Sequence, residues 1–145
     1  LDTTMFGPGT LDESHRRRSI YFMIKRSRLI PIMQVFDQPE PLVSQGSRPS
    51  TTIAPQALLF MNNPQVVKWA HGLAQNLDAS QPDEAIRQLY LRTLTREPTL
   101  AELTNSRAFF DSQSTSYSKE KNAAQLALAD LSQVMLSLNE FIYLP

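Results

Sequence analysis

The sequence has no cysteine among its 145 residues and only two histidines, His15 and His71. The absence of cysteine excludes disulfides, thiol nucleophiles, iron–sulfur clusters and covalent haem attachment through a C-x-x-C-H motif within this chain. Neither histidine has further ligands at the spacing that a zinc or haem site requires, so we expect no metal site. Because no known catalytic spacing is present, we assign no catalytic residue.

Long apolar runs are also missing. No stretch reaches the roughly 20 apolar residues that span a bilayer, and none has the pattern of a signal peptide. Glycine is scarce, with 4 residues against 10 prolines, which leaves few flexible points in the backbone. The first residue is Leu1 rather than methionine, and we expect the chain to be a piece of a larger polypeptide.

The composition is that of a folded protein, with 41% hydrophobic and 19% charged residues. We expect a single helical domain over residues 1–145, irregular over 1–51 and a helical bundle over 52–145. The formal net charge is zero, yet residues 1–28 contain six basic and three acidic residues, a balance of +3. Such a local basic segment gives weak support for a polyanionic partner.

The N-terminal part predicts short elements. Residues 16–28 fit either the alternation of a strand or the spacing of a helix. We favour a helix, because no neighbouring segment offers a strand to pair with. Pro31 suits the first turn of a short helix ending at Phe36. Residues 37–51 contain three prolines and predict a long extended connection.

From Thr52 onward the spacing is helical. Thr52 is expected to cap a helix that starts near Ala54, and Asn63 followed by Pro64 signals a second start. Pro82 opens a third helix, and Thr99-x-x-Glu102 has the form of a capping box. We expect the helix after the capping box to bury Leu100, Leu103 and Phe110. Ser112 to Ser118 is predicted to be an exposed loop, and one helix is predicted from Lys119 to Ile142. The fold class is therefore all-α, with four or five main helices in a bundle-like arrangement.

An ordered set of motifs runs along nearly the whole chain and resembles one family. The motifs are Arg17-Arg18-Ser19-Ile20-Tyr21 with Lys25-Arg26, Phe36-Asp37-x-Pro39, Thr51-Thr52-x-x-Pro55-Gln56-Ala57-Leu58 with Asn62, Leu94-x-Arg96-x-Pro98-Thr99-x-x-Glu102, Leu128-x-Asp130-Leu131 and Asn139-Glu140-Phe141-x-Tyr143. Together they resemble the C-terminal portion of a domain of unknown function found in large planctomycete proteins that also carry cytochrome-c-type domains. The resemblance implies an exported protein, periplasmic or at the cell surface, with haem only in other domains of the parent protein. It implies no reaction.

Eight residues are candidates for a polar network or a binding site: Arg17, Arg18, Tyr21, Lys25, Arg26, Asp37, Thr52 and Gln56. We favour internal ion pairing of the cations with acids such as Asp37, Glu40, Asp130 and Glu140. An anionic glycan or protein is the next alternative, and nucleic acid is a weaker one. The Thr51-Thr52-x-x-Pro55-Gln56 run predicts a helix cap with an amide in a supporting role rather than a ligand site. Arg96 is expected to pair with Glu102 or Glu97 at the corner between two helices.

Three hypotheses of function follow. The favoured one is a non-catalytic scaffolding or interaction module that contacts other domains of the same polypeptide. In the second, the chain supplies one wall of the active site of a cytochrome-c-linked redox or polysaccharide-processing enzyme, with Arg18, Tyr21, Asp37 and Gln56 facing a cleft. In the third, the Arg/Lys segment binds an anionic glycan. That hypothesis predicts salt-sensitive retention on a sulfated polysaccharide.

Overall fold

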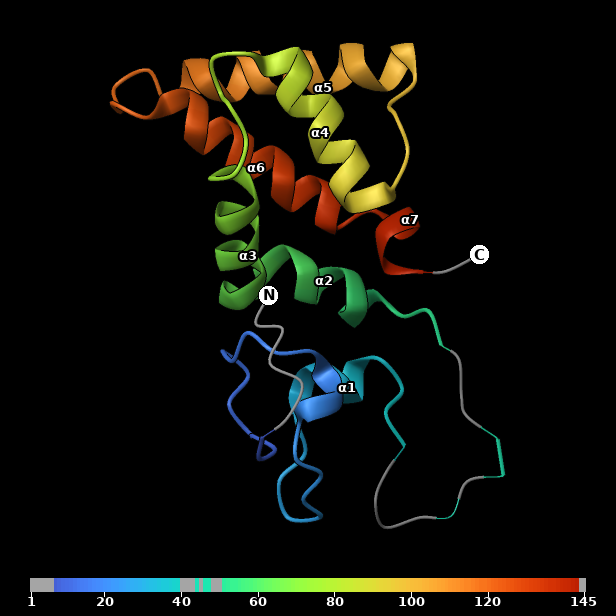
Figure 1. Cartoon of the computed structure of the whole chain (residues 1–145). Helices are drawn as coiled ribbons and strands as arrows, with labels where there is room; N and C mark the ends of the chain where they lie inside the picture. Colours follow the sequence, from blue (N-terminus) through green and yellow to red (C-terminus); the bar gives the residue numbers. More distant parts are fainter. Residues whose placement is uncertain (1–6, 40–43, 45, 48–50, 144–145) are drawn as a thin grey trace. The chain divides into compact units, whose positions relative to one another are not determined.

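The computed structural model describes residues 7–39, 44, 46–47 and 51–143. Within these residues the regular elements are a 3₁₀ turn and seven α-helices (Figure 1). In chain order they are η1 (Ser19–Tyr21), α1 (Pro31–Val35), α2 (Ala54–Asn62), α3 (Pro64–Ala74), α4 (Pro82–Leu94), α5 (Leu100–Ser116), α6 (Ala123–Leu136) and α7 (Asn139–Ile142). This part of the chain forms no strand, only two isolated β-bridges. The predicted all-α fold class is confirmed.

The chain divides into two compact units, Leu1–Leu59 and Phe60–Pro145, with the boundary inside α2. Our prediction of one domain, changing character after residue 51, stays a prediction. Much of the expected proline-rich connection, at residues 40–43, 45 and 48–50, lies outside the described residues. None of the helices in the described part of the chain has the length and apolar character that crossing a membrane requires.

The predicted helix over residues 16–28 is wrong. Only Ser19–Tyr21 forms a helical turn, and Thr10 forms a parallel bridge with Phe22. The Thr10 N–H donates to the Tyr21 carbonyl at 3.0 Å, and the Met23 N–H donates to the Thr10 carbonyl at 2.8 Å. Thr10 thus supplies the backbone partner that the sequence did not reveal, and Phe22, directly after the turn, has extended backbone.

Local start signals place most helices correctly. Pro31 occupies the first turn of α1, and Pro64 and Pro82 do the same in α3 and α4. The Asn63 side chain accepts a hydrogen bond from the Gln65 N–H at 2.7 Å, as an N-cap should. The predicted capping box is present at α5 in both of its hydrogen bonds, between Thr99 and Glu102. These predictions are confirmed.

α6 is the central helix of the second unit. It contacts α3, α4, α5 and α7 (Figure 1). Its buried residues extend well beyond one stripe: Ala127, Leu128, Ala129, Leu131, Ser132, Met135 and Leu136. The Ser132 hydroxyl lies in this core and donates to the Leu128 carbonyl at 2.7 Å, so its burial leaves no unmet donor. Ile86, Leu89 and Phe110 pack into the same core from α4 and α5.

The polar run after Phe110 continues α5 instead of forming the predicted loop. The Thr115 hydroxyl donates to the Asp111 carbonyl at 2.9 Å, and the Ser116 hydroxyl donates to the Ser112 carbonyl at 3.1 Å. These hydroxyls bond to carbonyls four residues back, so they need no water and α5 extends to Ser116. The same helix corrects a second prediction, since the Leu100 side chain is 82% exposed rather than buried.

The predicted helix from Lys119 to Ile142 is also wrong, because it is interrupted. α6 ends at Leu136, and Leu138 has extended backbone dihedrals before α7 begins at Asn139. The Ser137 hydroxyl donates to the Gln133 carbonyl at 2.8 Å and closes the last turn of α6. α7 then turns Phe141 toward Phe60, with ring centroids 6.4 Å apart in an edge-to-face contact.

Two Leu→Ala substitutions test the central role of α6. Leu128 is fully buried, so Leu128→Ala should lower the free energy of unfolding by about 2–5 kcal/mol through the lost contacts and the remaining cavity. Leu100→Ala, in the same unit, removes the same atoms from an exposed site. It should change the free energy of unfolding by no more than about 0.5 kcal/mol. Urea denaturation followed by helical circular dichroism measures both. Equal losses would contradict this arrangement of the core.

Candidate functional site

The Gln56 side chain is buried at the start of α2 and ties together three segments of the first unit. It is 1% exposed. Its Oε1 accepts from the Ile53 N–H at 3.2 Å, and its Nε2 donates to the Val35 and Thr51 carbonyls, each at 3.0 Å. A side chain that reaches back to the residue before its helix is one half of a capping box. Gln56, rather than the predicted Thr52, therefore makes the side-chain contact at this helix start.

Asp37 lies beside this amide because of how α1 ends. The Asp37 N–H donates to the Gln34 carbonyl at 3.3 Å, and the Gln38 N–H donates to the Met33 carbonyl at 3.0 Å. This pair of bonds is a Schellman motif, which requires a left-handed residue after the helix. Asp37 has a φ of 58° and fills that position. Asp tolerates this conformation better than most residues other than glycine.

The Asp37 carboxylate binds the segment that leads into α2, at Thr51. Its Oδ2 accepts from the Thr51 N–H at 2.7 Å, and its Oδ1 accepts from the Thr51 hydroxyl at 2.8 Å. Because Gln56 also bonds to the Thr51 carbonyl, Thr51 links Asp37 with Gln56. We call these three residues the Thr51 clamp. Its bonds to backbone groups fix the chain on both sides of the proline-rich connection, which is a structural task.

Arg17 and Tyr21 form a second contact in the first unit. The guanidinium carbon of Arg17 lies 3.5 Å from the centre of the Tyr21 ring, a close cation–π stack. The Arg17 Nη1 also donates to the Pro8 carbonyl at 3.3 Å. The ring of His15 meets the Phe22 ring edge to face, with centroids 4.5 Å apart. Two cation-capable side chains therefore pack against two consecutive aromatic rings.

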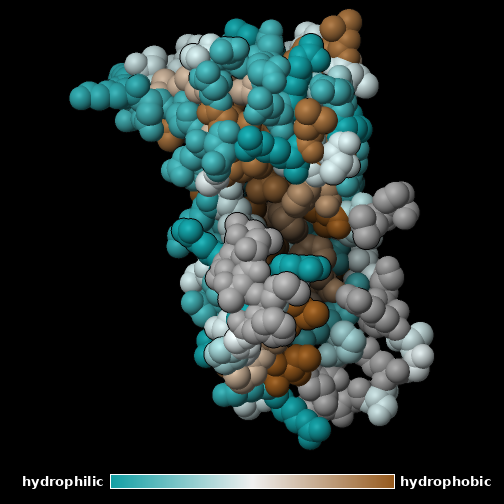
Figure 2. Space-filling view, viewed as in Figure 1, coloured by the Kyte–Doolittle hydropathy of each residue, from teal (hydrophilic) through white to brown (hydrophobic). Residues whose placement is uncertain are grey.

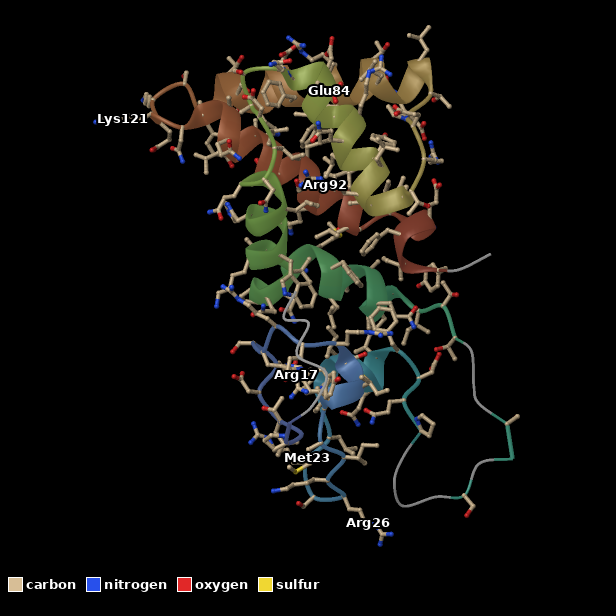
Figure 3. The ribbon with its side chains drawn as sticks, viewed as in Figure 1. Arg17, Met23, Arg26, Glu84, Arg92 and Lys121 are labelled. Atoms are coloured by element: carbon tan, nitrogen blue, oxygen red, sulfur yellow. The ribbon has the colours of Figure 1, made fainter. Side chains whose placement is uncertain are left out.

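The other candidate side chains are exposed. Arg18, Lys25, Arg26 and Thr52 all face solvent, and Figure 3 shows Arg26 extending away from the ribbon while Arg17 lies among neighbouring side chains. In the described part of the chain, no carboxylate lies within ion-pair distance of Arg18, Lys25 or Arg26. Whether the eight candidates share one function stays a prediction. Groups of three or more residues able to hold a metal are absent from the same described ranges.

A groove on α6 is the feature that sequence reasoning missed. It encloses about 460 Å³ in the second unit. We call it the α6 groove, and its lining residues are Met61, Phe109, Asp130, Gln133, Val134, Ser137 and Leu138. On α6 and its C-cap, the lining positions 130, 133, 134 and 137 follow one face of a helix. Their signal in the sequence was Val134, an apolar residue that is not in line with Leu128, Leu131 and Met135 of the core.

Apolar side chains in and near the groove reach solvent. Met61 is 60% exposed and Val134 is 43% exposed, and Figure 2 shows brown apolar areas among teal hydrophilic ones on the face in view. The polar lining residues are largely engaged. The Gln133 Nε2 donates to the Met61 carbonyl at 2.9 Å, and the Tyr117 hydroxyl donates to the Asp130 Oδ2 at 2.9 Å. Among the described residues that line the groove, Asp130 is the one with a formal charge.

Arg96 has a structural role at the corner between α4 and α5, as predicted. Its Nη1 and Nη2 donate to both Glu102 oxygens at 2.9 and 2.7 Å, and its Nη1 also donates to the Glu97 carbonyl at 3.1 Å. Its Nε and Nη2 donate to both Glu140 oxygens at 2.7 and 2.8 Å. All five N–H groups of this guanidinium are used. The sequence predicted Glu102 as a partner but not Glu140, which brings α7 to the corner.

This ion-pair cluster perturbs two carboxyl groups. The Arg96 hydrogen bonds, with further bonds from Thr99, lower the pKa of Glu102 from its usual 4.5 to about 2. The Arg96 hydrogen bonds also lower the pKa of Glu140. Both carboxylates are partly exposed, so each pair contributes modestly to stability.

The Thr51 clamp generates one prediction. Asp37→Gly should speed hydrogen exchange of the Thr51 amide, because the carboxylate acceptor is lost while glycine keeps the left-handed backbone. Asp37→Ala should show the same loss and an additional destabilisation of about 1 kcal/mol, since alanine is strained at this φ. Asp37→Asn, which retains an acceptor oxygen, is the matched control. Wild-type protection in Asp37→Gly would rule out the clamp.

The Glu102 pKa generates a pH prediction. A carboxyl whose pKa is lower in the folded state stabilises the fold above its unfolded pKa, and that contribution disappears as the pH falls through the folded value. The Glu102 contribution should therefore be complete above about pH 4.5 and be lost toward pH 2. Glu102→Gln should flatten the decline of thermal midpoint over this window. Glu120→Gln, at an exposed loop residue, should leave the decline unchanged, and an identical decline in all three proteins would refute the assignment.

Comparison with known families assigns the chain to one of them. The model of PSD1, described as a protein of unknown function (DUF1553), matches residues 6–110, well over half of the 145 residues. Comparisons with curated proteins and with solved structures give no match. The matched residues contain the Thr51 clamp and the Arg17–Tyr21 stack, and they end before α6. Because this match covers more than half of its residues, the chain belongs to PSD1, a family of proteins of unknown function.

Proposed function

We propose that this chain is a non-catalytic interaction module that binds an amphipathic protein segment in the α6 groove. The observation that carries the proposal is the groove itself, in which an apolar, partly exposed helix face surrounds one carboxylate. The occupant we propose is a segment of another domain of the same polypeptide. It presents apolar side chains at helical spacing and a Lys or Arg opposite Asp130.

The lining supports an apolar occupant. Met61, Phe109, Val134 and Leu138 supply the apolar surface, and Met61 and Val134 expose much of theirs. Exposed apolar surface that is framed by polar residues is characteristic of interaction sites. Methionine suits such a surface, because its flexible side chain adapts to the shape of a partner. A volume of about 460 Å³ accommodates a few large side chains rather than a whole domain.

The charge supports a basic residue in the occupant. The Tyr117 hydroxyl donates to one oxygen of Asp130, and the carboxylate has a second oxygen that can accept further bonds. The hydrogen bond from Tyr117 also holds the Asp130 side chain in place. A Lys or Arg beside this carboxylate would fix the register of the bound segment, because electrostatic complementarity contributes mainly to specificity.

The wider setting is part of the proposal and rests on the family resemblance. We infer an exported protein of planctomycete type, periplasmic or at the cell surface. In this setting the cytochrome-c-type domains, and any haem, lie elsewhere in the parent polypeptide. The present chain then contributes domain contacts and carries no cofactor of its own.

Site-specific photocrosslinking in the full-length polypeptide tests the proposal. A benzophenone amino acid at Val134 should form adducts with one defined segment of another domain, with apolar residues next to a Lys or Arg. The same probe at Leu100 is the matched control, because Leu100 is also apolar and exposed but lies on α5 outside the groove. Mass spectrometry of the crosslinked peptides identifies the segment.

A charge variant distinguishes specific binding in the α6 groove from non-specific hydrophobic contact. Asp130→Asn keeps an acceptor for the Tyr117 hydroxyl and removes the charge, so it should lower the yield of the Val134 adduct several-fold. Glu120→Gln removes one charge from an exposed loop and should leave the yield unchanged. Identical adducts from Val134 and Leu100, or an acidic segment as the partner, would overturn the proposal.

A further inference from the structure

The basic segment presents its residues to two different sides. Along residues 14–18, the exposed positions Ser14, Arg16 and Arg18 alternate with the partly buried His15 and Arg17. Neighbouring side chains in this stretch thus have different surroundings, one facing solvent and the next packed against the protein. His15 and Arg17 therefore face inward together, and Arg16 and Arg18 face solvent.

Both inward residues have polar atoms that are buried without a hydrogen-bond partner. They are Nε and Nη2 of Arg17 and both ring nitrogens of His15. Buried polar groups are nearly always paired in folded proteins, and an unpaired donor on a charged group is especially costly. These four nitrogens without hydrogen-bond partners, on His15 and Arg17, therefore require an explanation.

The two Arg17 nitrogens form one edge of the guanidinium. Nε and Nη2 point the same way and can bind two oxygens of one planar or tetrahedral oxyanion. Arg96 uses this same pair of atoms to bind Glu140 in the second unit. Arg17 differs because Nη1 bonds to the Pro8 carbonyl and the guanidinium face stacks on Tyr21, so the remaining edge has a fixed direction.

The geometry points to an oxyanion site formed by Arg17 and His15, for one sulfate or carboxylate group of an anionic glycan. The Arg17 edge supplies two N–H donors, and the His15 ring supplies a further one. Exposed Arg16 and Arg18 would extend the positive field to neighbouring groups of the same polymer. Gly7 packs close to Nη1 and Nη2 of Arg17, so its backbone has to move for an anion to reach the edge.

A glycan fits better than nucleic acid because of the two aromatic rings. Binding of single-stranded nucleic acid depends on rings that are available for stacking with bases. Here Tyr21 is stacked with Arg17 and Phe22 is packed against His15. Recognition by this segment would therefore use charge and hydrogen bonds rather than base stacking.

NMR titration of the whole chain with sodium sulfate, against sodium chloride at equal ionic strength, tests the site directly. The Nε–H resonance of Arg17, assigned in the wild-type protein by through-bond correlation to its backbone resonances, should shift and saturate, while that of Arg18 should not. This measurement uses the wild-type protein, so it decides the question even if a variant fails to fold. An Arg17 resonance that does not respond to sulfate would overturn the proposal.

Matched variants add a quantitative check. Arg17→Lys keeps the charge but loses the two-donor edge, so it should weaken sulfate binding at least about tenfold in a thermal-shift titration. Arg18→Lys is the control and should bind within about twofold of wild type. Sulfate stabilises many proteins by exclusion from their surface, so equal stabilisation of Arg17→Lys and wild type would count against the site.

Further titrations distinguish a glycan-borne anion from free inorganic sulfate and from nucleic acid. A heparin-derived sulfated oligosaccharide that shifts the Arg17 resonance at lower concentration than inorganic sulfate would support a glycan-borne group. An oligonucleotide of equal charge that binds more tightly than the oligosaccharide, through Arg17, would overturn the glycan assignment. A loss of oligosaccharide binding in Arg18→Lys but not in Arg17→Lys would equally contradict the proposed edge.

Discussion

The second unit depends on the burial of α6. This helix is apolar on more than one side, since Ala127, Leu128 and Ala129 follow each other and are all buried. A helix of this kind requires neighbours around most of its circumference. α3, α4, α5 and α7 provide them, and small residues such as Ala70 and Ala74 on α3 let that helix come close. The α6 groove lies on the face where this enclosure is incomplete.

Much of this helical architecture could be predicted from the sequence, because its signals are local. Pro64 after Asn63, Pro82, and the Thr99 capping box act within one turn of the chain, and all three mark real helix starts. The wrong predictions of secondary structure concern interactions that cannot be inferred from the residue types alone. Ser and Thr usually signal a loop, but in α5 their hydroxyls bond to carbonyls four residues back. The pairing of Thr10 with Phe22 depends on tertiary structure.

The candidate sites show the same limit. Asp37 and Gln56 could be selected by residue type and position, yet their shared partner, Thr51, and the Val35 carbonyl follow only from the path of the chain. Arg17 and Arg18 are adjacent and chemically identical in the sequence, but the structure gives them opposite surroundings. The groove was missed because Asp130 and Val134 lie on a different face of α6 from the core residues Leu128, Leu131 and Met135.

The Arg96 cluster has a further consequence for the α6 groove. Glu140, in α7, is bonded to Arg96 across 44 residues of sequence, and Leu138, just before α7, lines the groove. The Leu138 end of the groove is therefore stabilised by the partly exposed Arg96–Glu140 ion pair as well as by buried apolar contacts. Dissolved ions screen such charges over a distance of roughly 8 Å at physiological concentration. This end of the groove should thus loosen in concentrated electrolyte, which would make occupancy of the groove responsive to the salinity of the protein's surroundings.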